Sequence, residues 1–209
     1  QQLIISGDFS MLDGMPCLNI GAFSNNQLEC LGNGLVGTVN GVFQTNEGLF
    51  AYGELIYGPD TYPLAMFDGN QWNYIDVPNR SGAIAHAGDY ALGTSYIVVI
   101  SHPSNPGNQE IWHNHFQDGW ILKAHVNGEI YDIANTTFQR AYAGRFDEVV
   151  LYENMVADSV FTTSNLIVKS SYLEDWGGIV GEVSDTIKTI CFVGNTLYAG
   201  GNCSLDTLK

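Results

Sequence analysis

The apolar positions of this chain fall in short runs rich in Val, Ile, Tyr and Phe, and the runs are separated by polar turns. This pattern is typical of β-strands, and no segment shows a convincing helical periodicity. The turns Ser24–Gln27 and Asp68–Gln71 are rich in Asn, Asp and Gly. These residues tolerate the positive φ angles of tight hairpins, so both segments are expected to act as turns. We therefore predict an all-β protein.

The sequence also repeats itself. Thr38–Gly53 aligns with Thr186–Gly201 at one constant offset of 148 residues, which three repeats of about 49 residues would give. Each repeat is expected to hold four strands, and in the second repeat these are Thr38–Gln44, Leu49–Leu55, Leu64–Phe67 and Trp72–Val77. The matching apolar strand of the successive repeats begins near Leu3, Leu49, Ser95, Glu148 and Leu197.

Four short strands recurring every 40 to 50 residues or so are the signature of propeller blades. We predict a β-propeller of four to five blades, forming a single domain over residues 1–209. A β-solenoid or two stacked sandwiches are the structural alternatives. Because the last repeat holds only its first two strands, we expect the chain to be a piece of a larger ring.

Net charge and hydropathy exclude some classes of binding partner. The chain has 22 acidic and 7 basic residues, for a net charge of −15. Such a surface repels phosphate backbones and anionic headgroups, so we expect no nucleic-acid partner. No apolar run reaches the roughly 18 residues of a membrane-spanning helix, so we expect no membrane insertion.

The four cysteines match neither a zinc-finger spacing nor a CxxC redox motif. One or two disulfides are possible in a secreted chain, and buried free thiols are the alternative. The sequence leaves all three pairings open among Cys17, Cys30, Cys191 and Cys203.

Several segments resemble the repeats of secreted bacterial β-propeller proteins common in Bacteroidota. The resemblance is carried by ISGDFSMLDGMPCLNIGAF, ECLGNGLVGTVNGVF and LYAGGNCSLDTLK, and it is loosely similar to kelch repeats. It implies a propeller, a location outside the cell or at its surface, and export as cargo of the type IX secretion system.

A metal site is one hypothesis for the histidines, because all five fall within one repeat. His113 and His115 are two residues apart, which places both on one face of a strand. With His102 or Glu110 they could ligate zinc or copper. The alternative is that this repeat uses histidine as a polar filler.

A ring of polar groups is a second hypothesis. The residue after the glycine position of the matching strand is expected to converge with its equivalents near one mouth of the channel. Such a ring could bind Ca²⁺, a polyol or a glycan, or the side chains could simply cap strand ends. The predicted members are Asp8, Glu54, His102, Glu153 and Asn202.

Tryptophans could stack on sugars or contact a protein partner, although most are expected in the core. Trp176 is the first candidate for an exposed contact, because its surroundings are the least repeat-like. We predict a non-enzymatic extracellular module that binds proteins or glycans. One alternative is a secreted glycan-active hydrolase using Asp8, Glu54 and Glu153. Another is a structural subunit of a larger surface complex.

Overall fold

The computed structural model describes residues 2–45, 47–78, 83–88, 95–102, 105–115, 119–135, 139–153, 156–162, 165–170, 183–193 and 196–205. The described residues are all β, in several antiparallel sheets without a helix, so none of them forms a helix that could cross a membrane. The chain divides into two compact units, Gln1–Ile84 and Ala85–Lys209. Each unit is described by itself, and the predicted single domain stays a prediction.

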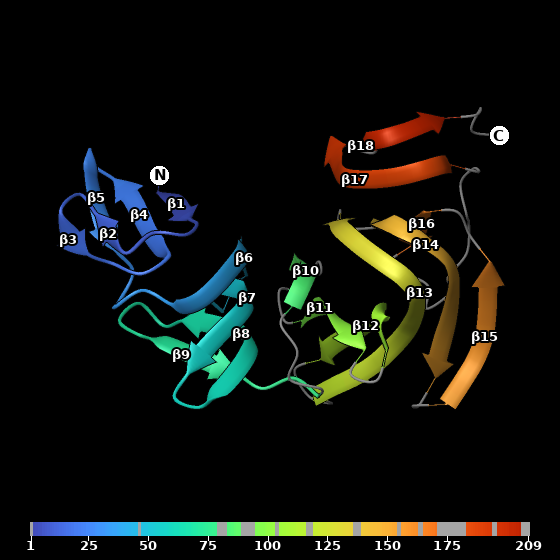
Figure 1. Ribbon diagram of the computed structural model, residues 1–209, viewed down its shortest axis with the longest axis horizontal. Helices are drawn as coiled ribbons and strands as arrows, with labels where there is room; N and C mark the ends of the chain where they lie inside the picture. The colour runs from blue at the N-terminus through green and yellow to red at the C-terminus, as the bar shows by residue number, and fades with distance from the viewer. Residues whose placement is uncertain are drawn as a thin grey trace. The chain divides into compact units, whose positions relative to one another are not determined.

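Unit 1 contains a sheet of order β1-β4-β5, a small hairpin β2-β3, and a four-stranded sheet of order β6-β7-β8-β9 (Figure 1). The last sheet is the predicted second repeat, with its four strands in chain order. The bounds are β1 Leu3–Ser6, β2 Met11–Leu12, β3 Met15–Pro16, β4 Ile20–Ser24, β5 Gln27–Cys30, β6 Val36–Gln44, β7 Leu49–Tyr57, β8 Asp60–Phe67 and β9 Trp72–Ile75.

Unit 2 contains a seven-stranded sheet of order β10-β11-β12-β13-β14-β15, with β16 pairing β14, and a separate hairpin β17-β18. In Figure 1, β13 runs as one long curved strand between β12 and β14. The bounds are β10 Ala83–Gly88, β11 Ser95–His102, β12 Asn105–His115, β13 Gly119–Asn135, β14 Gln139–Glu153, β15 Val156–Thr162, β16 Leu166–Ser170, β17 Val183–Val193 and β18 Thr196–Leu205.

The turns form as their residues require. The β4–β5 turn has positive φ at Asn25 (49°) and Asn26 (61°), as predicted. In the β8–β9 turn, the Asp68 carboxylate accepts the Asn70 and Gln71 amides at 2.9 Å each, and the Asn73 side chain donates to it as well. These hydrogen bonds lower the pKa of Asp68, with the Gln71 amide contributing most.

We number the repeats by their strands. Repeat 1 is β1, β4 and β5, repeat 2 is β6–β9, repeat 3 runs from β10 into β13, repeat 4 is the second half of β13 with β14 and β16, and repeat 5 is β17–β18. Each repeat has two faces, which we call proximal and distal and define by their residues. The proximal face holds Val39 and Val42 in repeat 2, Ile130 and Ile133 in repeat 4, and Ile187 and Ile190 in repeat 5. The distal face holds Ile4, Phe50, Ala141 and Tyr198 in repeats 1, 2, 4 and 5.

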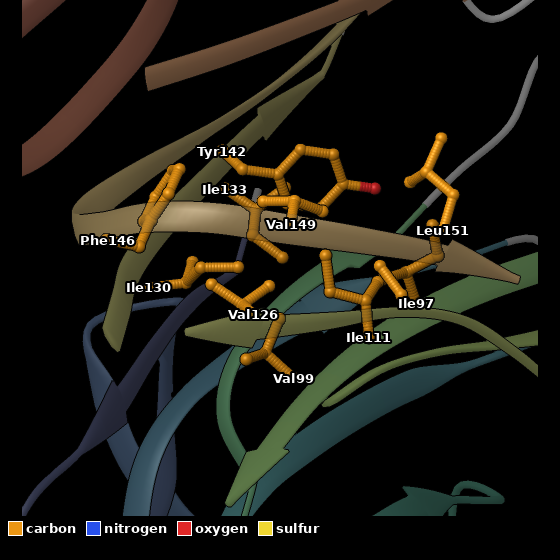
Figure 2. Close-up of a cluster of buried hydrophobic side chains, with 11 residues drawn as sticks. Ile97, Val99, Ile111, Val126, Ile130, Ile133, Tyr142, Phe146, Val149 and Leu151 are labelled. Carbon is orange, nitrogen blue, oxygen red and sulfur yellow. The ribbon is translucent and has the colours of Figure 1, made fainter. Parts of the chain in front are cut away.

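The hydrophobic cores lie between successive repeats within each unit. In unit 1, Ile4, Ile20 and Ala22 of repeat 1 pack with Val42, Ala51 and Ala65 of repeat 2. In unit 2, Ile97, Val99 and Ile111 of repeat 3 pack with Ile130 and Tyr142 of repeat 4 (Figure 2). Ala141 and Leu166 of repeat 4 pack with Ile187 and Ile190 of repeat 5.

One disulfide joins Cys17 to Cys30, with their Cα atoms 5.5 Å apart. Cys191 is a free, exposed thiol on β17. Cys203 lies opposite Asp185, six positions along β17 from Cys191, which is roughly 20 Å at about 3.3 Å per residue. A disulfide needs Cα atoms within about 7 Å, so the register excludes a bond between Cys191 and Cys203.

Candidate binding surface

The same bulged hairpin occurs in repeats 2, 4 and 5. In repeat 2, Val39 pairs with Gly53, the ladder skips Asn40, and Gly41 pairs with Tyr52. In repeat 5, Ile187 pairs with Gly201, the ladder skips Lys188, and Thr189 pairs with Gly200. The predicted offset of 148 residues is therefore confirmed in the hydrogen-bond register, bulge included.

Repeat 4 contains the third copy. Ile130 pairs with Gly144, the ladder skips Tyr131, and Asp132 pairs with Ala143. The strand with the repeat glycine is therefore Gln139–Gly144, and not the segment beginning at Glu148 that the sequence indicated.

The repeat glycine is dictated by a close backbone approach. A Cβ on Gly53 would lie 2.0 Å from the Thr38 carbonyl oxygen, and one on Gly144 would lie 1.9 Å from the Glu129 oxygen. Real Cβ atoms do not come this close to another atom, so any side chain here would push the two strands apart. The close approach at the bulge therefore requires a glycine at this position.

Repeats 1 and 4 share two hydrogen bonds from the strand with the repeat glycine to an asparagine. The Gly7 amide donates to the Asn19 carbonyl at 3.0 Å and the Phe9 amide to Asn19 Oδ1 at 3.2 Å. In repeat 4 the Gly144 amide donates to the Asn165 carbonyl at 3.1 Å, and the Phe146 amide to Asn165 Oδ1 at 3.0 Å. Both asparagines have positive φ, 61° and 65°. Asp8 and Arg145 therefore occupy equivalent positions.

The residue after the repeat glycine is exposed in all four of these copies. Their side chains differ in charge and size, being Asp8, Glu54, Arg145 and Asn202. Glu54 faces Thr38, Arg145 faces Glu129, and Asn202 faces Thr186 across the hairpin. The backbone is thus constant, whereas the presented chemical group changes from repeat to repeat.

One other predicted ring member lies elsewhere, because Glu153 pairs with Val156 at the β14–β15 turn and the equivalent position belongs to Arg145. His102 ends β11 and pairs with Asn105, and its membership of the ring stays a prediction. Convergence of Asp8 and Glu54 with residues of unit 2 stays a prediction, and so does binding of Ca²⁺ there.

A group of tyrosines lies at the end of repeat 2. The exposed Tyr57 ring (64 % exposed) stacks on Tyr74 with ring centroids 4.9 Å apart and an interplanar angle of 27°. The Tyr62 ring lies 5.4 Å from Tyr74. Burial, and secondarily Tyr57, raise the pKa of Tyr74, so its phenol stays protonated at neutral pH. We call Tyr57, Tyr62 and Tyr74 the tyrosine stack.

The sequence did not single out these tyrosines, because Tyr57 and Tyr74 are brought together across the sheet by the β7–β8 and β8–β9 pairings. The predicted aromatic candidates are placed otherwise. Trp72 and Trp112 are buried, as the core interpretation predicts, with Trp72 Nε1 donating to the Leu31 carbonyl at 2.9 Å. Trp176 lies outside the described residues.

The histidine-rich repeat holds a buried polar group. The Glu110 carboxylate, 3 % exposed, accepts Trp112 Nε1 at 2.7 Å and lies 3.2 Å from His125 Nε2. Glu110 therefore contacts a histidine that the metal hypothesis did not use. Among the described residues, no group of three His, Cys, Asp or Glu side chains is arranged to hold a metal ion. A metal site at His113 and His115 with His102 or Glu110 stays a prediction.

No protein family, no curated protein and no solved structure matches this chain. The fold and site therefore define it as an all-β protein of repeated, face-packed antiparallel sheets.

Proposed function

We propose that this protein is a β-propeller-type binding module that works outside the cell and holds a neutral glycan at the tyrosine stack. One observation carries the proposal: the same bulged hairpin in repeats 2, 4 and 5 is followed by a different exposed group each time, Glu54, Arg145 and Asn202, and Asp8 takes the equivalent position in repeat 1. Variable groups on a rigid frame are the usual arrangement of recognition surfaces.

The propeller itself is supported by the packing of successive repeats within each unit. The first strands of repeats 4 and 5 also lie together, because Asp132 accepts Thr189 Oγ1 and the Ile190 amide at 2.9 Å each. Contact between the first strands of successive blades is what an arrangement around one axis requires.

The chemistry of unit 1 favours a neutral sugar chain. The exposed Tyr57 ring offers a flat apolar surface for the C–H face of a pyranose, and its hydroxyl offers a hydrogen-bonding group. The sequence of unit 1 holds eight acidic residues and one basic residue, Arg80. Anionic polysaccharides are therefore repelled. The Cys17–Cys30 disulfide agrees with an oxidising compartment.

The test is affinity electrophoresis on a panel of soluble neutral polysaccharides, with an anionic one for comparison. We expect retardation by at least one neutral polymer, and roughly fivefold to tenfold weaker binding by Tyr57→Ala through the lost stacking. Tyr131→Ala is the matched control, because Tyr131 is exposed but hydrogen-bonded to Glu129 instead of stacked.

Two results would contradict this function. Lack of retardation by every neutral polymer, or equal binding by Tyr57→Ala, would remove the glycan site. Release of reducing ends that disappears in Asp8→Ala, Glu54→Ala or Glu153→Ala would replace a binding module by the hydrolase alternative.

A further inference from the structure

Repeat 2 carries an exposed patch on one face of its first hairpin. Val36 pairs with Ile56 and Thr38 with Glu54 across β6 and β7, without a shift of register between the two pairs. Alternate residues of a strand lie on the same face, so these four side chains share one face. All four are exposed, Val36 at 47 % and Ile56 at 41 %. We call Val36, Thr38, Glu54 and Ile56 the repeat 2 patch.

The same positions are exposed in a repeat that has a neighbour on each side. Glu54 and Ile56 follow the repeat glycine of repeat 2 by one and three positions. Repeat 4 packs against repeat 3 and against repeat 5, and its residues at these two positions, Arg145 and Asp147, are nevertheless exposed, as is Glu129 opposite Arg145. Neighbouring repeats therefore leave this end of the hairpin open, and the same is expected of the repeat 2 patch.

Repeat 2 differs from repeats 4 and 5 in the chemistry at this place. In repeat 4, Asp147 accepts Asn127 Nδ2 at 2.7 Å, and in repeat 5 the corresponding pair is two serines. Both arrangements are polar, whereas Val36 and Ile56 present two branched aliphatic side chains to solvent. Removing these side chains from water against a partner is favourable. Repeat 2 is therefore suited to an apolar contact at a place where its equivalents are not.

One carboxylate lies beside this aliphatic pair. Glu54 is two residues from Ile56 on the same face of β7, which places their Cα atoms about 7 Å apart at roughly 3.3 Å per residue. Lysine and arginine combine an aliphatic stem of comparable length with a cationic end, and such stems cover apolar surface well. The sequence of unit 1 holds eight acidic residues and one basic residue, so it attracts cations.

We propose that the repeat 2 patch binds a lysine or arginine side chain in a basic segment of a partner protein. The stem lies on Val36 and Ile56, and the charged end lies on the Glu54 carboxylate. Ile56 and Tyr57 are consecutive on β7 and point to opposite faces, so this surface is separate from the tyrosine stack. The inference goes beyond the proposed glycan binding and does not depend on it.

The experiment uses the full chain and a fluorescein-labelled peptide of six arginines as the probe, with binding followed by fluorescence anisotropy at several NaCl concentrations. Wild type is expected to bind, and to bind more weakly as salt screens the charges. Glu54→Gln should weaken binding about threefold, because one surface ion pair is lost. Ile56→Ser should weaken it to a similar extent without any change in net charge, because the arginine stem loses its apolar contact.

Two control variants separate the patch from general attraction to an acidic chain. Asp147→Asn removes one negative charge at the equivalent place of repeat 4, and Val193→Ser removes an aliphatic side chain of repeat 5 that is 64 % exposed. Both should bind like wild type. Val36→Ser repeats the apolar test, and far-UV circular dichroism checks that every variant folds. Lack of binding by wild type, equal weakening in Glu54→Gln and Asp147→Asn, or unchanged binding by folded Ile56→Ser or Val36→Ser would overturn the proposal.

Discussion

Repeats 1 and 5 differ in how much of one face is covered by other described residues. On the proximal face of repeat 1, Leu12 of the β2–β3 hairpin lies over Gly21, where an added Cβ would meet its Cδ2 at 2.4 Å. Cys30 pairs with Gly21, so its disulfide to Cys17 ties the chain after that hairpin to the same face. On the distal face of repeat 5, Val193 and Tyr198 are exposed among the residues that the structure describes.

The comparison shows that a repeat face can be completed by a local hairpin as well as by a neighbouring sheet. An apolar face open to water is costly, so a hairpin of the same repeat can stabilise the fold by covering it. The β2–β3 hairpin is such a cap over the centre of its face, beside the exposed pair Leu3 and Phe23.

The largest effect is expected from releasing this cap. The double substitution Cys17→Ser and Cys30→Ser opens a loop with a sequence separation of 13. We expect a loss of about 3 kcal/mol in the free energy of unfolding, measured by urea denaturation. Cys191→Ser is the control and should change little, since its thiol is free and exposed. Equal stability of the double variant and wild type would show that the hairpin holds without the disulfide.

A smaller effect on stability is expected from substituting the repeat glycines of repeats 1 and 4, and it should differ between the two. In Gly144→Ala the new Cβ would meet the Glu129 carbonyl oxygen, whereas at the equivalent Gly7 nothing lies within 4 Å. We expect Gly144→Ala to lose about 2 to 3 kcal/mol. Gly7→Ala should be neutral or gain up to about 1 kcal/mol, because alanine restricts the unfolded chain. Similar losses in both variants would contradict the difference in backbone approach between the two glycines.

The smallest effect concerns the turns of repeats 1 and 2. The β4–β5 turn relies on two asparagines with positive φ, whereas the β8–β9 turn uses the Asp68 carboxylate. Because the folded pKa of Asp68 is below its ordinary value of 3.8, its contribution is present above that value and is lost as pH falls through the folded pKa. The stability difference between wild type and Asp68→Ala should therefore shrink in acid. A difference that is independent of pH would contradict the carboxylate's role.

Local pattern was enough to predict the all-β class, the four strands of repeat 2 and the equivalence of Thr38–Gly53 with Thr186–Gly201. The matching strand of the fourth repeat was misplaced because Glu148–Leu151 is a stronger apolar run than Gln139–Gly144. The latter includes the charged Arg140 and two alanines. The shared spelling Gly-x-Phe in Gly7–Phe9 and Gly144–Phe146 was the signal that could have corrected it.

The tyrosine stack and the disulfide pairing could be identified only from the register of the strands. Tyr57 and Tyr74 are 17 residues apart and meet only because β8 lies between their strands in a fixed alignment. The choice of Cys30 as the partner of Cys17 depends on where the β2–β3 hairpin folds back. Neither fact is contained in composition or spacing.

The hydrogen bonds around Asn19 and Asn165 have a consequence for how such a chain can change. The separation between phenylalanine and asparagine is 10 residues in one case and 19 in the other, yet the same pair of backbone amides is bound in both. The two anchor points therefore accept segments of different length between them, namely the β2–β3 hairpin in repeat 1 and the rest of β14 with β15 in repeat 4. One repeat can thus gain strands while the anchoring hydrogen bonds stay the same, which makes these two positions natural entry points for engineering.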